Sequence, residues 1–202
     1  MGSRLSERPL CHADEPQRPA PAPAIDQRHG PRTGRRTAVT APLIVVGGVA
    51  GCGKTTLAAA LADALGINFR DGDDLHPEAN KAKMAAGQPL TDADRAPWLA
   101  ACAAQLAAWG DAGGVISASA LKRAYRDTLY AAHPAVRYVL IHITPELATA
   151  RAQARAGHFW PASLTLSQFA ILEEPAADEP AILVDATWPT DQQVAAVQGF
   201  LR

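Results

Sequence analysis

The chain has 202 residues, of which 48% are hydrophobic and 19% are charged, and its formal net charge is −1. This length suits one domain with a sizeable apolar core, and the near-zero charge argues against bulk binding to nucleic acid or to a membrane surface. Three widely spaced cysteines form no disulfide or metal pattern, and no apolar run is long enough to span a membrane or serve as a secretory signal. We therefore expect a reduced, cytoplasmic protein with neither kind of partner.

Residues 1–42 differ in composition from the rest of the chain. They hold seven prolines and seven arginines against four acidic residues, with almost no large apolar side chain. Such a segment cannot bury enough surface to offset its chain entropy. We predict a disordered tail over 1–42 and a single domain over 43–202. The four acidic residues argue against an organelle transit peptide.

From residue 43 onward, short apolar runs alternate with segments of helical periodicity. The apolar runs predict five strands, at 43–46, 68–71, 115–119, 136–143 and 181–185. The segments between and after them predict helices at 55–65, 78–86, 92–110, 122–132, 145–156, 164–174 and 190–201. This alternation predicts an α/β fold of three layers, with a parallel sheet that helices cover on both faces.

The turn between the first strand and the first helix has a phosphate-binding sequence. Residues 48–55 read GVAGCGKT and match GxxxxGK[ST] at every fixed position. Glycines let the backbone approach an anion, and N–H groups at a helix N-terminus bind phosphates. We expect Lys54 to reach the β- and γ-phosphates of ATP, Thr55 to hold Mg²⁺, and Cys52 to be a small filler. The predicted nucleotide site comprises Gly48, Gly51, Cys52, Gly53, Lys54, Thr55 and Thr56.

Two acidic residues follow the second predicted strand, where residues 71–77 read DGDDLHP. In an extended chain, Asp71 and Asp73 would point the same way, so that Asp71 supports Mg²⁺ while Asp73 orients or deprotonates an attacking hydroxyl. The alternative is an Asp/Gly turn with capping acids. The third predicted strand ends without an acid, which argues against GTPases and mechanical ATPases.

Several separated strings resemble the gluconate kinase (gluconokinase) family, small-metabolite P-loop kinases related to shikimate kinase. Besides the phosphate loop and DGDDLHP, they are a pattern between Asn80 and Leu99, SALKRAYRD at 119–127, ARAGHF at 154–159 and QFAILEEP at 168–175. The resemblance implies a P-loop kinase fold with a five-stranded parallel sheet and a mobile lid. It also implies that ATP and Mg²⁺ are used to phosphorylate gluconate to 6-phosphogluconate, and that the enzyme is a homodimer.

The resemblance further implies roles for individual residues. Asp71, Asp73 and His76 would line the sugar-acid pocket, and Arg95 would bind the substrate carboxylate with its planar guanidinium. Positive charge at the end of the third strand would come from Lys122 and Arg126, and the lid would contribute Arg151, Arg155 and His158. Lys54, Asp73 and Arg155 would be the catalytic residues.

Three interpretations of these strings stay open. The basic residues of the two later helices could equally form a solvated surface. A shikimate-type or other small-metabolite kinase would share the phosphate loop, although the His76-Pro77 pair and the long 78–110 helical insertion favour gluconate. A nucleotide-binding module that hydrolyses or senses ATP without a metabolite is the alternative from another class.

Overall fold

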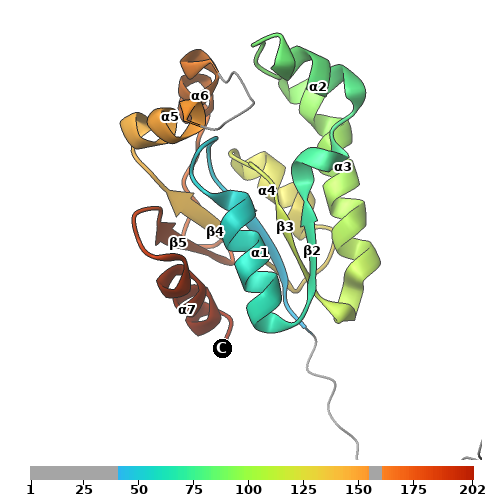
Figure 1. Cartoon of the computed structure of the whole chain (residues 1–202). Helices are drawn as coiled ribbons and strands as arrows, with labels where there is room; N and C mark the ends of the chain where they lie inside the picture. The colour runs from blue at the N-terminus through green and yellow to red at the C-terminus, as the bar shows by residue number, and fades with distance from the viewer. Residues whose placement is uncertain (1–40, 155–160) are drawn as a thin grey trace, which may run out of the picture. The chain divides into compact units, whose positions relative to one another are not determined.

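The computed structural model describes residues 41–154 and 161–202. Its centre is a five-stranded parallel sheet with the strand order β2-β3-β1-β4-β5 (Figure 1). The strands are β1 (Leu43–Gly47), β2 (Asn68–Asp71), β3 (Gly114–Ser117), β4 (Val136–His142) and β5 (Ala181–Asp185). The predicted parallel sheet is confirmed, and because all strands run the same way, their carboxyl ends meet at one edge.

The predicted helices are also present, with small shifts at their ends. They are α1 (Lys54–Leu65), α2 (Glu78–Ala85), α3 (Asp92–Trp109), α4 (Arg123–Tyr130), α5 (Pro145–Gln153), α6 (Ala162–Phe169) and α7 (Thr190–Phe200), with short 3₁₀ helices η1 (Gly72–Leu75) and η2 (Gly110–Ala112). The largest difference is in α6, which was predicted to reach residue 174. It ends at Phe169, and the Glu173 N–H donates instead to the Leu121 carbonyl at 2.9 Å.

Alternate strand residues feed two apolar layers, one on each face of the sheet. On the first face, α1 and α7 pack over Ile44, Val46, Val115, Val139, Ile141 and Val184 (Figure 1). On the second face, α3 and α4 pack over Leu43, Val45, Ile116, Val136, Tyr138 and Leu140. The period of two along each strand sends neighbouring side chains to opposite faces, and this accounts for the near-continuous apolar runs in the sequence.

The last two residues of the predicted tail bond to the domain. The Ala41 N–H donates to the Asp111 carbonyl at 3.2 Å, and the Pro42 carbonyl accepts from the Gly114 N–H at 3.1 Å. Residues 1–40 and 155–160 lie outside the described residues, so the predicted disorder of the tail stays a prediction. Among the residues that the structure describes, no helix has the length and apolar character of a membrane span.

Candidate active site

The phosphate loop joins β1 to α1 in a conformation that needs glycine. Gly48, Gly51 and Gly53 have φ angles of 132°, 82° and 103°, a region that other residues rarely adopt. A Cβ atom at Gly51 would also lie 2.3 Å from the Ala148 carbonyl oxygen, so only glycine lets α5 pack directly against this loop. The sequence pattern therefore encodes both the turn and its contact with α5.

Side chains within the loop have distinct environments. Lys54 lies at the start of α1, and its Nζ donates to the Val49 carbonyl at 3.1 Å. Cys52 is only 2% exposed, and its burial raises the pKa of its thiol, which keeps the sulfur protonated and unreactive. This agrees with the interpretation of Cys52 as a filler.

Asp71 connects the loop to two neighbouring strands. Its carboxylate accepts hydrogen bonds from the Thr55 hydroxyl at 2.9 Å and the Ser117 hydroxyl at 2.8 Å. Because β3 lies between β2 and β1 and ends in the small Ser117, an acid on β2 can reach across it to the phosphate loop. Asp71 is thus next to Thr55, the predicted metal ligand.

The chain does not stay extended after Asp71, and that expectation was wrong. Gly72 starts η1, and the Asp71 carboxylate caps it by accepting from the Asp73 N–H at 3.0 Å. A Cβ atom at Gly72 would lie 2.2 Å from the Ser117 carbonyl oxygen, so η1 packs closely on β3. The acids therefore form a capping turn and still lie at the site. The Asp71 carboxylate faces Thr55, whereas Asp73 faces a cleft.

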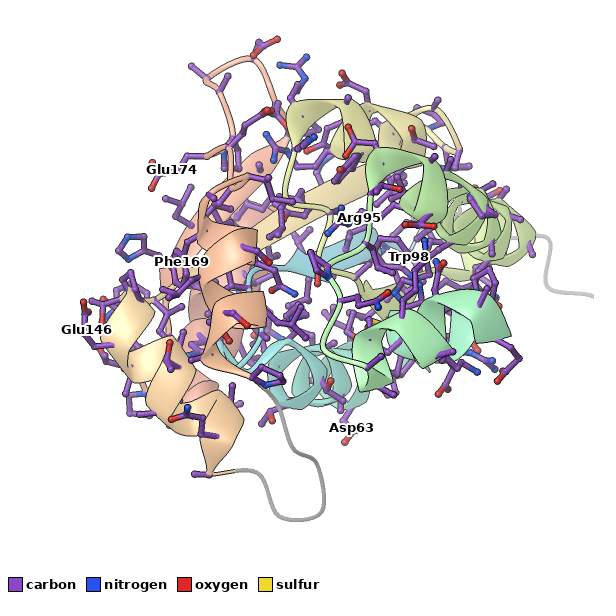
Figure 2. All side chains as sticks on the ribbon, turned by 90° about the horizontal axis from the view of Figure 1, so that it is seen from above. Asp63, Arg95, Trp98, Glu146, Phe169 and Glu174 are labelled. Atoms are coloured by element: carbon purple, nitrogen blue, oxygen red, sulfur yellow. The ribbon has the colours of Figure 1, made fainter. Side chains whose placement is uncertain are left out.

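That cleft has a volume of about 720 Å³ and lies above the carboxyl ends of the strands. Seen from above in Figure 2, α2 and α3, with Arg95 and Trp98, stand on one side, and α5 and α6, with Phe169, stand on the other. The cleft brings together eight of the predicted site residues, Gly51, Gly53, Lys54, Thr55, Asp73, His76, Arg95 and Arg151. Six others do not line it as far as the described residues show, namely Gly48, Cys52, Thr56, Asp71, Lys122 and Arg126.

The wall formed by η1, α2 and the start of α3 fixes an aromatic pair. The His76 ring stacks on Trp98 with a centroid distance of 4.5 Å and an interplanar angle of 8°. Trp98 is held in turn, because its indole Nε1 donates to the Gly72 carbonyl at 2.8 Å. Burial lowers the pKa of His76, which favours a neutral imidazole in this wall.

Two cations of this wall line the cleft, Lys81, whose Nζ donates to the Glu78 carboxylate at 2.8 Å, and Arg95. The second of them, Arg95, has a different environment. Its guanidinium lies 5.8 Å from the centre of the Tyr125 ring, and its Nη1 donates to the Leu90 carbonyl. No carboxylate among the described residues forms an ion pair with Arg95. Its charge is therefore available to an anion in the cleft.

The prediction of Arg126 as a substrate ligand is wrong. Its side chain is 1% exposed and donates to both carboxylate oxygens of Glu179, at 2.6 Å and 2.8 Å. It also donates to the Leu121 and Glu173 carbonyls, at 3.1 Å and 2.8 Å. With these four hydrogen bonds to three residues, the guanidinium braces α4 against residues 173–179 and has no access to the cleft.

Lys122 also has a partner within the protein. Its Nζ donates to both carboxylate oxygens of Asp92, at 2.9 Å and 2.8 Å, and lies 5.5 Å from the centre of the Tyr125 ring. The ion pair joins the start of α4 to the start of α3. The structure does not bring Lys122 into the cleft.

Comparison with known proteins agrees with this geometry. A family model described as an AAA domain matches residues 43–175. Over 144 residues, the chain is 54% identical to the gluconokinase of Gluconobacter oxydans (strain 621H), which covers 70% of this chain and 80% of that relative. The crystal structure of a gluconokinase from Sinorhizobium meliloti 1021 matches with a TM-score of 0.73 at 40% identity, covering 80% of this chain and 92% of that chain.

This chain belongs to the gluconokinase family. The resemblance seen in the separated sequence strings is thereby confirmed. The shikimate kinase of Bacteroides thetaiotaomicron has the same fold, with a TM-score of 0.58 at 18% identity over 79% of this chain and 98% of that chain. The similarity to shikimate kinase concerns the fold alone.

The segment predicted to form a lid is described only at its two flanks, α5 and α6. Arg155 and His158 lie outside the described residues, so their predicted roles stay predictions. Arg151 on α5 lines the cleft, and its two terminal nitrogens each donate to the Ala186 carbonyl at 3.2 Å. These bonds hold α5 to the segment that follows β5.

Sequence reasoning gave no role to Gln168, although this residue is in direct contact with the phosphate loop. Its side-chain Oε1 accepts from the Ala50 N–H at 2.7 Å, and it lines the cleft from α6. Gln168 begins the family-like string QFAILEEP, so the signal was present in the sequence. A pairing between positions 118 residues apart could not be derived from that string.

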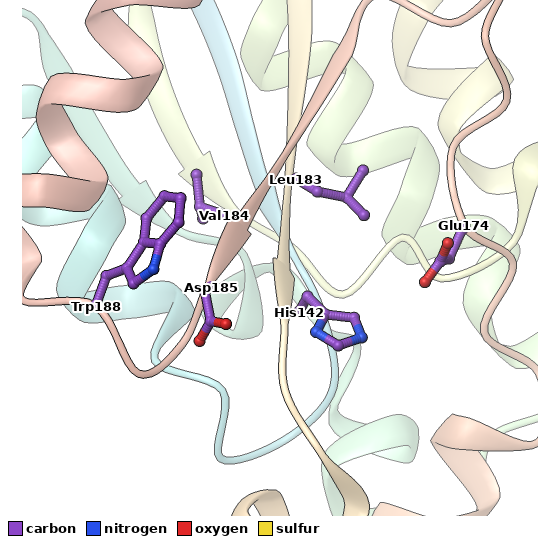
Figure 3. Close-up of a pocket in the computed structure, with 6 residues that line it drawn as sticks. All are labelled: His142, Glu174, Leu183, Val184, Asp185 and Trp188. Atoms are coloured by element: carbon purple, nitrogen blue, oxygen red, sulfur yellow. The ribbon is translucent and has the colours of Figure 1, made fainter.

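A second, shallow depression of about 320 Å³ lies at the ends of β4 and β5 (Figure 3). It is lined by His142, Glu174, Leu183, Val184, Asp185 and Trp188. The Asp185 carboxylate is engaged by the Thr187 N–H and hydroxyl, at 2.7 Å and 2.6 Å, and thus closes a turn. No phosphate-loop residue lines this depression, so the cleft above the strands is the candidate active site.

Proposed function

We propose that this chain transfers the γ-phosphate of ATP to the terminal hydroxyl of gluconate and forms 6-phosphogluconate. One observation carries the proposal. A single cleft joins phosphate-loop residues, Lys54 and Thr55 among them, to an acid, Asp73, and to Arg95, a cation without a carboxylate partner among the described residues. The chain that forms it is 54% identical to a gluconokinase. Phosphoryl transfer needs little covalent chemistry, so positioning and electrostatic stabilisation are what such a cleft must supply.

The nucleotide end of the cleft would be formed by residues 48–56. Backbone N–H groups of the loop and the Lys54 ammonium would bind the phosphates, with Arg151 at the rim. The hydroxyl of Thr55 and the carboxylate of Asp71, joined by a 2.9 Å hydrogen bond, are the hard oxygen donors that suit Mg²⁺, so these two residues would hold it. When bound, Mg²⁺ would neutralise charge on the phosphates.

The acceptor end of the cleft would be formed by η1, α2 and α3. The Arg95 guanidinium would pair with the gluconate carboxylate, because its fork matches a carboxylate in shape and charge. His76 would bind an oxygen of the sugar acid, and the Asp73 carboxylate would orient the terminal hydroxyl and take up its proton. We also propose that Arg155 and His158 belong to a lid over the cleft and that the enzyme is a cytoplasmic homodimer, as the family resemblance implies.

A coupled ADP-release assay tests this function against its alternatives. With gluconate, shikimate, adenylate or no acceptor, we expect gluconate to give the highest turnover by a wide margin. Preference for shikimate would favour the other small-metabolite kinase. ADP release that is independent of every acceptor would favour the nucleotide-binding module.

Substitution of Asp73 tests the site within the same assay. Asp73→Asn should lower gluconate-dependent kcat by about 10²- to 10⁴-fold, because a positioned proton acceptor is lost. Asp63→Asn on α1 is the matched control, and its turnover should equal that of the wild type. Unchanged turnover in Asp73→Asn would contradict the assignment.

A further inference from the structure

We propose that Asn80 is a positioning residue that fixes the tautomer of His76, so that the ring offers a neutral Nε2–H donor to an oxygen of the sugar acid. This inference deepens the proposed function and rests on it. Asn80 is part of the family-like pattern between residues 80 and 99, yet none of the roles described above includes it. Its side chain does not line the cleft, so any effect on the substrate is indirect, and one of its two hydrogen-bond partners, His76, does line the cleft.

The orientation of the Asn80 amide is set by an acceptor that cannot change its role. Asn80 is 3% exposed, and its Nδ2 donates to the Asp94 backbone carbonyl at 2.7 Å. A carbonyl oxygen only accepts hydrogen bonds, so the amide atom that faces it must be the nitrogen. A flipped amide would bring two oxygens together in a buried place, which is costly.

The same amide nitrogen determines the tautomer of His76. Asn80 Nδ2 lies 3.2 Å from His76 Nδ1 and has a second hydrogen to donate. Since Nδ2 only donates, Nδ1 must accept, and an accepting Nδ1 carries no proton. The proton of the neutral ring is therefore on Nε2.

We call the two hydrogen bonds from Asp94 through Asn80 to His76 the relay, and its first residue, Asp94, is firmly held. Asp94 forms a capping box with Thr91 at the start of α3, and its carboxylate accepts from Lys83 Nζ at 2.6 Å. The hydrogen bond from Lys83 also holds the pKa of the Asp94 carboxyl below its usual range. The Asp94 carbonyl thus sits in a braced first helical turn, and Asn80 ties α2 to it.

The ring of His76 is fixed in direction as well as in protonation. Stacking on Trp98 defines the ring plane, and His76 is a lining residue of the cleft although it is only 7% exposed. Burial is the main cause that lowers the pKa of His76, and the charges of Arg95 and Lys81 lower it further, whereas Asp73 acts in the opposite direction. The ring of His76 is therefore a neutral Nε2–H donor. It binds an oxygen of the sugar acid, while Arg95 pairs with the carboxylate charge.

Nitrogen-15 NMR of the full chain with labelled histidine tests the tautomer without any substrate. At neutral pH, we expect the wild-type His76 signal, assigned by its loss in His76→Gln, to show a protonated Nε2 and an unprotonated Nδ1. Asn80→Asp should move the proton to Nδ1, because a carboxylate accepts where the amide donated. Asn68→Asp, at the only other asparagine in the sequence, should leave His76 unchanged. A wild-type ring that is protonated on Nδ1, or on both nitrogens, would overturn the inference.

Steady-state kinetics test the consequence for the substrate. Asn80→Asp should raise the KM for gluconate about tenfold or more and change the KM for ATP by about twofold at most. In this variant His76 Nε2 carries no proton, so it is an acceptor that faces an acceptor oxygen of the sugar acid. In His76→Gln, whose amide nitrogen can take the place of Nε2, the same Asn80→Asp change should have much less effect on the KM for gluconate. If Asn80→Asp raises the KM for gluconate equally in the wild type and in His76→Gln, the inference is wrong and the change causes a general structural defect.

The two experiments also separate this inference from the proposed function. If gluconate does not stimulate ADP release while the NMR result is as expected, the proposed function fails and the control of His76 by Asn80 stands. If gluconate stimulates ADP release but the wild-type ring carries its proton on Nδ1, the inference alone fails.

Discussion

Two regions rich in charge lie on the same side of the sheet, and their arginines differ in how many partners they have within the protein. In the cleft wall, Arg95 donates to one carbonyl and has no carboxylate partner among the described residues. In the cluster that joins α4 to residues 173–179, Arg126 donates to two carboxylate oxygens and two carbonyls and is 1% exposed. This difference shows that an arginine is available to a ligand only where the protein leaves N–H groups of its guanidinium without an acceptor.

The largest expected effect comes from breaking the buried cluster. Glu179→Ala would leave Arg126 buried without its carboxylate, so the free energy of unfolding should fall by about 3–5 kcal/mol. Chemical denaturation measures this directly. Glu78→Ala is the matched control, because its carboxylate also pairs with a cation, Lys81 at 2.8 Å, but is 89% exposed. That control should lose about 1 kcal/mol or less. Similar losses in both variants would show that the cluster is not the brace described.

The same pair predicts how stability changes with pH. Burial opposes ionisation of Glu179, but the hydrogen bond from Arg126 prevails and holds the pKa of Glu179 below its usual range. A lowered pKa in the folded state stabilises the fold above the unfolded-state pKa, and that contribution is lost as the pH falls through the folded-state pKa. We therefore expect the difference in free energy of unfolding between wild type and Glu179→Gln to have its full size above about pH 4.5. This difference should shrink as the pH falls below that value, which denaturation measured at a series of acid pH values will show.

Arg95 should show the opposite pattern, with a large effect on the substrate and a small effect on the fold. Arg95→Met should raise the KM for gluconate about 10- to 100-fold, because a charge-assisted pair with the carboxylate is lost. Its free energy of unfolding should change by about 1 kcal/mol or less. Arg123→Met, which removes a half-buried arginine that is paired with Asp127 at 2.7 Å and Asp178 at 3.1 Å and lies outside the cleft, should leave the KM unchanged. If Arg95→Met unfolds the protein as readily as Glu179→Ala, the contrast between the two regions is wrong.

The smallest effect is expected at Gln168, which contacts the loop from the side of the cleft opposite Arg95. Gln168→Leu removes the acceptor of the Ala50 N–H, and one neutral hydrogen bond is worth about 1 kcal/mol, so the KM for ATP should rise up to about tenfold. Gln192→Leu on α7, an exposed site, should match the wild type. Tighter ATP binding in Gln168→Leu would instead mean that Gln168 competes with a phosphate for this N–H.

The sequence predicted the parts of the site that local rules determine. The phosphate loop follows from glycine positions between an apolar run and a helix, and the parallel sheet follows from the alternation of these elements. Arg95 and Arg126 both stand in family-like strings, and nothing local separates them. Only the partner Glu179, 53 residues from Arg126, decides which arginine is buried.

The same limit applies to Asp71, Gln168 and Asn80. The turn of η1 and the reach of Asp71 across β3 depend on strand order, which the sequence did not supply. The bond from Ala50 to Gln168 depends on how α6 folds back over the loop. Asn80 and His76 are four residues apart, but the tautomer depends on the Asp94 carbonyl, which belongs to another helix.

A crystal structure with a non-hydrolysable ATP analogue, Mg²⁺ and gluconate tests the central claim most directly. It should show the gluconate terminal hydroxyl between the Asp73 carboxylate and the γ-phosphate, and its carboxylate on the Arg95 guanidinium. Gluconate bound elsewhere, or Asp73 and Arg95 both turned away from it while the phosphate loop is filled, would contradict the account.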